Sequence, residues 1–306
     1  MISILTGQDN VRLLARHTSH EISEEWKKQL LIDVGDDFRN LGPIEYWECP
    51  ITNIRWYTPE EAAGGCELYA QLENFDWYYM SDKWEFSAAL SLLPFPASIL
   101  EVGVGEGHFL QSAREHKHTV QGVELNPKGA KRARRLGFQV YELSLDDLSK
   151  QTNERFDAIC SFQVLEHVPN PYKFLEGMIS LLKPGGKMIL SVPNSAVMRK
   201  IDPQNIGLLN QPPHHMSHWD ESVFRALEEL LPLKVKSVHR EPLASYHVAG
   251  VVTGYLRNIF FQQGITIPRF LVNRYTTLPI QWLMLLGVRN FFPGHTLLVE
   301  LEYQPN

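Results

Sequence analysis

The sequence predicts an α/β fold in which a parallel sheet is covered by helices on both faces. From Ser98 onward, short apolar segments alternate with amphipathic segments of helical length, and the first apolar segment ends in a glycine-rich turn. Residues 156–162 are almost uniformly apolar, as in a parallel strand buried on both faces. Residues 91–243 are therefore expected to form a Rossmann-like core.

The elements of this core follow from the periodicity of the apolar residues. Strands are expected at residues 98–102, 119–124, 139–143, 156–162, 187–192, 234–239 and 295–303, and helices at 107–116, 127–136, 171–182 and 220–231. The third of these helices is expected to end at Lys183-Pro-Gly-Gly186. Because parallel strands joined by right-handed crossovers share one carboxyl edge, ligands are expected at that edge.

Residues 1–90 differ in composition and are expected to form an N-terminal cap rich in helix and aromatic residues. A helix is expected at 23–32, with Ser23 as its N-cap. Aromatic residues gather at 45–59 and at 75–80, and a further helix is expected at 83–93.

Residues 244–291 are expected to form a helical insertion, and residues 292–306 the final strand that completes the core. No acidic residue lies between Glu241 and Glu300. The arginines and apolar clusters of this stretch are Arg257, Arg269, Arg274, Arg289, 259–261 and 282–286. Basic apolar helices bind anionic membrane surfaces, which gives one interpretation of the insertion. A buried lid and a dimer interface are the alternatives.

Composition narrows the function classes. The net charge of −6 and a pI near 6.1 disfavour a broad nucleic-acid-binding surface. Cys49, Cys66 and Cys160 form no C-x-x-C pair, so neither a zinc knuckle nor a disulfide framework is expected. We find no secretory signal and no apolar run of membrane-spanning length, so the expected location is the cytoplasm.

The turn after the first strand indicates a nucleotide-type ligand. Gly103, Gly105 and Gly107 allow positive φ angles and a close approach of the ligand to the backbone. A dinucleotide fingerprint would need a glycine where the chain has His108. Glu101, just before the turn, would repel a pyrophosphate but suits the ammonium and sulfonium of S-adenosylmethionine.

Other cofactor contacts are expected along the same edge. Glu124 ends the second strand, where a carboxylate accepts ribose hydroxyls, a feature that NAD sites share. The turn after the third strand is expected to line the adenine pocket. The remaining candidates for cofactor binding are Leu125, Ser144, Leu145, Phe162 and Gln163.

Four linked segments resemble the class I S-adenosylmethionine-dependent methyltransferases. They are 99–110, 120–124, 156–168 and 181–194. The resemblance implies a seven-stranded sheet whose last strand is antiparallel, and S-adenosylmethionine as cofactor. Leu165-Glu-His-Val168 resembles the quinone-biosynthesis O-methyltransferases, and 209–219 resembles a bacterial subgroup associated with glycan or secondary-metabolite clusters. Some of that subgroup carry an N-terminal zinc knuckle, of which only Cys49 remains here.

The resemblance also bears on two groups of histidines. His167 follows the fourth strand and is a candidate general base, a metal ligand with Glu166, or a structural residue. Metal-binding relatives carry an acid where this chain has Gln163, so no metal is expected. His214 and His215, close to His218 and Trp219, are candidates for the base or for acceptor binding. A purely structural role and zinc binding are the alternatives for this group.

In this family the region before the first strand often closes over the cofactor or acceptor. That role and plain core packing are both open for the aromatic residues Trp77, Tyr78, Tyr79 and Trp84.

The sequence thus predicts an S-adenosylmethionine-dependent methyltransferase that acts on an oxygen, or less readily a nitrogen or carbon, of a small molecule or glycan. The alternatives are an NAD-dependent Rossmann oxidoreductase and a catalytically silent protein that binds S-adenosylmethionine. Partners considered beyond the acceptor are a second copy of the chain and a membrane surface; no nucleic acid is expected.

Overall fold

A seven-stranded sheet forms the centre of the computed structural model, which describes every residue except 76, 77, 79, 206, 266, 269 and 306. In spatial order its strands are β10 (Leu233–Pro242), β11 (Pro293–Tyr303), β8 (Leu182–Pro193), β7 (Phe156–Phe162), β4 (Ser98–Val102), β5 (Thr119–Val123) and β6 (Gln139–Tyr141). The pairs from β8 to β6 are parallel, whereas β11 runs antiparallel to both of its neighbours. The expected Rossmann-like sheet with an antiparallel last strand is confirmed.

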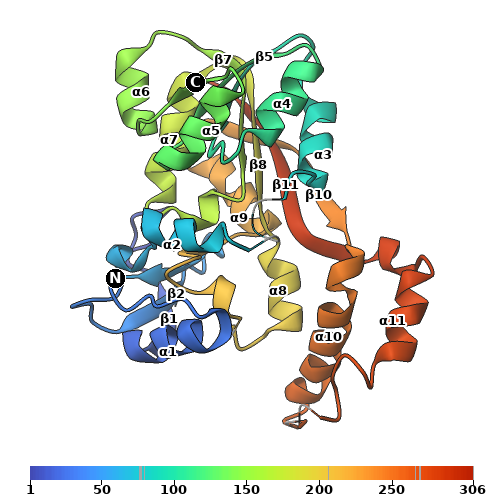
Figure 1. The fold of residues 1–306 in the computed structure, drawn as a ribbon. Coiled ribbons are helices and arrows are strands. Elements are labelled where there is room, and N and C mark those ends of the chain that lie inside the picture. Colours follow the sequence, from blue (N-terminus) through green and yellow to red (C-terminus); the bar gives the residue numbers. More distant parts are fainter. Residues whose placement is uncertain (76–77, 79, 206, 266, 269, 306) are drawn as a thin grey trace.

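Helices cover both faces of this sheet (Figure 1). They are α3 (Trp84–Leu92), α4 (His108–Glu115), α5 (Pro127–Arg135), α6 (Leu145–Gln151), α7 (Pro171–Leu181) and α9 (Glu221–Ala226). Successive side chains of a strand point to opposite faces. Accordingly Ile99 packs in one hydrophobic cluster with Phe109 of α4, whereas Leu100 packs in another with Leu175 of α7.

A second, four-stranded antiparallel sheet lies in the N-terminal part and was not predicted. It consists of β1 (Arg12–His17), β2 (Ile44–Glu48), β3 (Arg55–Thr58) and the two-residue β9 (Ser217–His218). β9 belongs to the segment that connects β8 to β10 of the central sheet, so the small sheet holds part of that segment in place. Helix α2 (Cys66–Leu72) packs against this small sheet, because Leu68 and Leu72 share one hydrophobic cluster with Ile44 of β2 and Tyr57 of β3.

The first helix, α1 (Ser19–Leu30), begins earlier than predicted. Thr18, not Ser23, is the N-cap: its hydroxyl accepts the Glu21 amide hydrogen, and the Glu21 carboxylate accepts that of Thr18. This reciprocal pair is a capping box, which satisfies two backbone donors at once. Ile22 and Trp26 then face the core one turn apart.

Two further details differ from the prediction. Lys183-Pro-Gly-Gly186 lies inside β8, where the pairing with β7 shifts register between Phe156 and Ala158. Helices α6 and α8 (Ser195–Ile201) were not predicted, because a helix of seven residues leaves little periodicity to detect.

Between β10 and β11 the chain forms α10 (Val248–Gln262) and α11 (Leu278–Leu285), which project from the body as an arm (Figure 1). The arm has a small hydrophobic cluster of its own, consisting of Leu243, Val248, Val251, Val252 and Met284. Among the described residues, no helix has the length and apolar character needed to cross a membrane.

Candidate functional site

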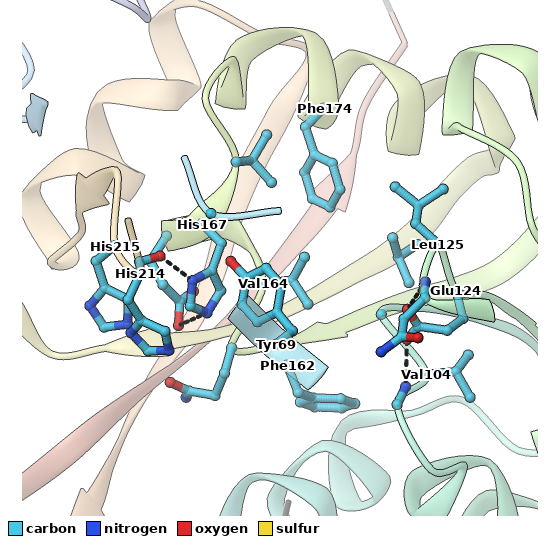
Figure 2. Close-up of a pocket in the computed structure, with 18 of the residues that line it drawn as sticks. Tyr69, Val104, Glu124, Leu125, Phe162, Val164, His167, Phe174, His214 and His215 are labelled. Carbon is cyan, nitrogen blue, oxygen red and sulfur yellow. Dashed lines mark hydrogen bonds and ion pairs between the residues drawn. The ribbon is translucent and has the colours of Figure 1, made fainter. Parts of the chain in front are cut away.

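A cavity of about 1180 Å³ opens at the carboxyl ends of β4, β5 and β7. Its wall is formed by the turn after β4, the ends of β5 and β7, the loop after β6 and the loop before β9. Every residue predicted to bind the cofactor lines it except Gly107, and so do His167, His214 and His215. Figure 2 shows Glu124 and Leu125 on one side of this cavity and His167, His214 and His215 on the other, with Phe162, Val164 and Tyr69 between them.

The glycine turn after β4 has the backbone that its sequence requires. Gly103, Gly105 and Gly107 all have positive φ angles, of 83°, 53° and 87°. A Cβ atom on Gly103 would lie 2.4 Å from a methyl group of Val164, so a side chain would collide there. Gly107 instead caps α4 behind the cavity wall, which explains why it does not line the cavity.

The carboxyl group of Glu101 faces the cavity from the end of β4. The residue is only 2% exposed, and its Oε2 has no hydrogen-bond partner among the described residues. Burial, reinforced by the nearby Glu124 carboxylate, raises the pKa of Glu101 well above its usual value. A buried carboxyl oxygen without a hydrogen-bond partner is costly, and a cationic ligand group would compensate it. The ammonium of a methionine moiety fits this requirement.

Glu124 is held in a fixed orientation at the end of β5. Its Oε2 accepts the Gly105 amide hydrogen and its Oε1 accepts the Asn126 amide hydrogen, each at 2.7 Å. Burial raises the pKa of Glu124, while these two bonds act in the opposite direction. A carboxylate has about four acceptor positions, so two remain for a pair of ribose hydroxyls.

The loop after β6 starts helix α6, which the sequence analysis missed. Ser144 is its N-cap and accepts the Asp147 amide hydrogen. Asp146 and Asp147, also unpredicted, line the cavity beside Leu145. A serine followed by two acids is a recognised signal for a helix start, and it was present in the sequence.

At the end of β7, Phe162 packs against aromatic residues and Gln163 forms a tight turn. The Phe162 ring lies 4.6 Å from that of Phe109 and 5.1 Å from that of Phe86. Gln163 has a positive φ of 55° and donates from Nε2 to the Ser191 hydroxyl at 3.3 Å. The turn directs the following segment toward the histidines.

Three histidines from two loops meet at the far end of the cavity. The ring centroids of His167 and His214 are 4.6 Å apart, those of His167 and His215 5.0 Å, and those of His214 and His215 4.4 Å. Nitrogen atoms of the three rings lie within 4.8 Å of one another, so these residues could hold a metal ion. Burial lowers the pKa of His167 to about 4, and it lowers the pKa values of His214 and His215 well below their usual value.

Hydrogen bonds to backbone carbonyls define the tautomers of two of these rings. His167 Nδ1 lies 2.5 Å from the His214 carbonyl oxygen, and His214 Nδ1 lies 3.0 Å from that of Leu209. Since a carbonyl only accepts, each Nδ1 carries the hydrogen and each Nε2 presents a lone pair. The Tyr78 hydroxyl lies 3.2 Å from the His214 Nε2.

Glu166, next to His167, was not among the predicted site residues of the catalytic or cofactor sets. It is 1% exposed, lines the cavity, and neither carboxyl oxygen has a hydrogen-bond partner among the described residues. Burial raises its pKa to about 8, so the group is protonated at neutral pH. One of its oxygens lies 3.8 Å from the His167 Nε2.

Three other residues named in the sequence analysis lie away from this cavity, where they contribute to packing or hydrogen bonding. His218 lies outside this cavity, between the Tyr46 hydroxyl at 2.6 Å and the Asn210 carbonyl at 2.8 Å. Trp219 is fully buried. Trp84 packs in a hydrophobic cluster beside Ile99. Trp77 and Tyr79 are not among the described residues, so the roles expected for them stay predictions.

The model of a family described as a methyltransferase domain matches residues 74–235 of this chain. The chain belongs to this family. The match runs from before α3 to the start of β10, and it includes Glu101, Glu124 and the three histidines of the cavity. It confirms the class I S-adenosylmethionine-dependent methyltransferase expected from the sequence, and it favours S-adenosylmethionine over a dinucleotide. The cofactor is therefore S-adenosylmethionine, and the unpartnered Glu101 and the oriented Glu124 fit it.

Curated relatives carry the name ubiquinone biosynthesis O-methyltransferase. That of Xanthomonas axonopodis pv. citri is 38% identical over 109 residues, which are 34% of this chain and 46% of that protein. That of Xanthomonas campestris pv. campestris is 33% identical over 118 residues, 36% of this chain and 48% of that protein. The matched region thus spans about half the length of these relatives.

Solved structures show more distant likeness. A Haloferax volcanii complex between the Trm112 methyltransferase activator and a methyltransferase has 17% identity and a TM-score of 0.48, covering 73% of this chain and 90% of that one. An S-adenosylmethionine-dependent methyltransferase from Mesorhizobium loti has 19% identity and a TM-score of 0.45, covering 73% and 100%.

Proposed function

We propose that this enzyme transfers the methyl group of S-adenosylmethionine to an oxygen atom of a small-molecule acceptor bound at the histidine end of the cavity. The observation that carries the proposal is the continuity of one cavity from Glu101 and Glu124 to His167 and His214. A methyl donor and an acceptor bound at its two ends would meet in the same enclosed space.

The donor end is assigned to the glycine turn and its neighbours. In this proposal Glu101 faces the ammonium of the cofactor, and Glu124 accepts the ribose hydroxyls. Ser144 and Leu145 border the adenine, and Phe162 and Gln163 border the reactive centre. When bound, the cofactor supplies an electrophilic methyl group on its sulfonium. The contribution of the chain is alignment, which alone is worth an effective molarity of about 10⁵ to 10⁸ M.

At the acceptor end, His167 is the proposed proton acceptor. Its Nδ1 is occupied by the His214 carbonyl, which leaves the Nε2 lone pair available. His215 would bind the acceptor through a ring nitrogen, and His214 would do so through the Nε2 that the Tyr78 hydroxyl contacts in this structure. General base catalysis contributes about 10²- to 10⁴-fold when a hydroxyl must lose its proton.

The low basicity of the histidines points to the class of acceptor. A base whose pKa lies near 4 takes a proton from an acidic hydroxyl, such as a phenol with a pKa of about 10, far more readily than from a sugar alcohol. Two aromatic side chains at this end, Tyr69 beside His167 and Tyr78 beside His214, suit a flat apolar ring. The name of the curated relatives, ubiquinone biosynthesis O-methyltransferase, agrees with such an acceptor.

The decisive experiment combines binding with turnover. Titration calorimetry with S-adenosylhomocysteine and with NAD should give heat with the first ligand alone. Labelled S-adenosylmethionine should then methylate members of a panel of phenols and leave a matched panel of glycans unlabelled. Binding without turnover on any acceptor would favour the catalytically silent alternative, and labelled glycans would favour the other acceptor class. A glycan acceptor and a homodimer stay predictions from the sequence.

A further inference from the structure

The α10–α11 arm has an inverted distribution of polarity. In α11 the polar Gln281 is buried and donates from Nε2 to the Arg274 carbonyl at 2.7 Å and the Thr277 hydroxyl at 2.8 Å. Six large apolar residues in this helix or directly after it are exposed instead, whereas Met284 is buried. The six form what we call the apolar arm surface: Leu278, Ile280, Trp282, Leu283, Leu285 and Leu286.

The apolar arm surface extends around most of the helix. At about 100° per residue its six members cover an arc of roughly 220°, and the buried Gln281 and Met284 occupy the rest. The segments before and after α11 add Phe270, 72% exposed, and Phe291, 88% exposed. Monomeric proteins rarely expose a contiguous apolar surface of this kind without a partner for it.

Charge distinguishes the arm from the rest of the molecule. Residues 242–299 contain four arginines and no lysine, aspartate or glutamate, so they carry a formal charge of +4. The whole chain carries −6, which leaves −10 for the remainder. Arg274 is exposed, with its guanidinium 4.8 Å from the ring centre of Tyr275. The arm is thus the part of the molecule that an anionic surface attracts, while the body is repelled.

We propose that the α10–α11 arm docks this enzyme on the surface of an anionic lipid bilayer. Exposed tryptophan and leucine side chains would enter the boundary between headgroups and acyl chains, with arginine at the headgroups. A second copy fits the observations less well. A symmetric dimer through this surface would place two arms of charge +4 against each other. A rigid partner face would also cover less of α11 than a fluid medium does.

The root of the arm adjoins the cavity. His247, one residue before α10, and His295 of β11 both line the cavity, and their rings lie 3.9 Å apart. An acceptor dissolved in the lipid would therefore have a short path to the site. The docking itself goes beyond the proposed function and does not depend on it.

Vesicle flotation tests the docking. The full-length protein should float with phosphatidylcholine vesicles that contain phosphatidylglycerol, and much less with phosphatidylcholine alone or at high salt. The double variant Trp282→Glu, Leu286→Glu should lose at least about tenfold in partitioning. Arg274→Ala should lose about fivefold on anionic vesicles. Leu31→Glu, at an equally apolar and 87% exposed position in the N-terminal part, is the matched control and should float like the wild type.

Retained binding of S-adenosylhomocysteine shows that each variant is folded, whatever the outcome for methyl transfer. Absence of flotation of the wild type, or equal flotation of the double variant, would overturn the proposal. Light scattering provides the other check. A concentration-dependent dimer that the double variant abolishes would assign the surface to a second copy and also overturn lipid docking.

Discussion

His167 donates a hydrogen bond from Nδ1 to the backbone carbonyl of His214, over 2.5 Å. This contact joins the short 3-10 turn after β7 to the loop before β9, two segments 47 residues apart in the chain. It leaves the Nε2 of His167 as an acceptor inside the cavity, which is the basis of the first prediction.

His167→Ala should lower turnover by at least about 10²-fold, because the acceptor hydroxyl loses its proposed base. Affinity for S-adenosylhomocysteine should stay the same, since the cofactor residues lie at the other end of the cavity. An assay with a labelled methyl donor measures turnover, and calorimetry measures the affinity for S-adenosylhomocysteine. His116→Gln, at an exposed position outside the cavity, is the control. Full activity in both His167→Ala and His215→Ala would remove histidine base catalysis.

Glu101→Gln should weaken binding of S-adenosylmethionine by roughly tenfold or more, because a charge-assisted contact to the ammonium becomes a neutral one. Glu124→Ala should likewise weaken binding through the ribose. Calorimetry gives both affinities. Glu115→Gln, which removes an exposed carboxylate from α4, should bind as the wild type does. Equal affinities in Glu101→Gln and the wild type would contradict the assigned role of the acid.

Gly103→Ala should destabilise the fold by about 1–3 kcal/mol and impair cofactor binding, because the residue has a φ of 83° and its new methyl group would meet Val164. Urea denaturation and calorimetry measure the two effects. Gly250→Ala is a sharp contrast: this glycine lies in α10 with open space around its Cβ position. That substitution should stabilise the protein by about 0.5–1 kcal/mol. Similar effects of the two changes would contradict the turn geometry.

Acid should destabilise the protein between about pH 6.5 and pH 4. His167, His218 and His295 have a pKa of about 4 when folded and near 6.5 when unfolded, so the unfolded chain binds more protons in this window. Their stabilising effect is present above pH 6.5 and is lost as the pH falls through the folded values. Each group contributes a slope of up to about 1.4 kcal/mol per pH unit.

Thermal unfolding at a series of pH values measures this slope. His215→Leu removes one buried, neutral histidine, so its unfolding temperature should depend less on pH than that of the wild type. An unchanged slope in this variant would indicate that His215 is not buried in the neutral form.

Removal of metal should leave catalysis intact. In the proposed mechanism His167, His214 and His215 act on the acceptor without a metal ion, so treatment with a chelator should change neither turnover nor the affinity for S-adenosylhomocysteine. Elemental analysis of the purified protein is the complementary measurement. The contrary result would be one equivalent of a divalent metal in the protein, with turnover lost on chelation and recovered when the metal is added back. That result would show that the histidines hold a metal centre and that His167 is not a free base.

The core of the fold was predictable because its signals are local. β4 and β7 have the bounds expected from their apolar runs, and the glycine turn at Gly103 follows where the spacing indicated. The second sheet was not predictable in the same way. β3 gains its partner β9 from a segment about 160 positions later in the chain, and such pairing leaves no periodicity in either segment.

In the candidate site, too, the residues with a local sequence signal were predictable, and those that reach the site by tertiary packing were not. Glu101 and Glu124 were expected because each ends a strand at a known edge of the sheet. Tyr69 was not expected, since α2 approaches the cavity only through tertiary packing. Glu166 was considered only as a metal ligand with His167, because an acid next to a histidine has no pattern that marks it as buried. The roles of the predicted residues in binding and catalysis stay predictions until they are measured.

The two ends of the cavity have separate origins in the chain, and this has an evolutionary consequence. The cofactor end is built by β4 and β5 and the turns after them and by the loop after β6, whereas the other end adds α2 and the loop before β9, which the small N-terminal sheet holds, to the turn after β7. Substitutions in α2 or in the loop before β9 therefore reshape the acceptor end without altering the residues of the donor end. A lineage with this architecture can diversify its substrates by changing the N-terminal ninety residues and one loop, while the methyl-donor machinery is inherited unchanged.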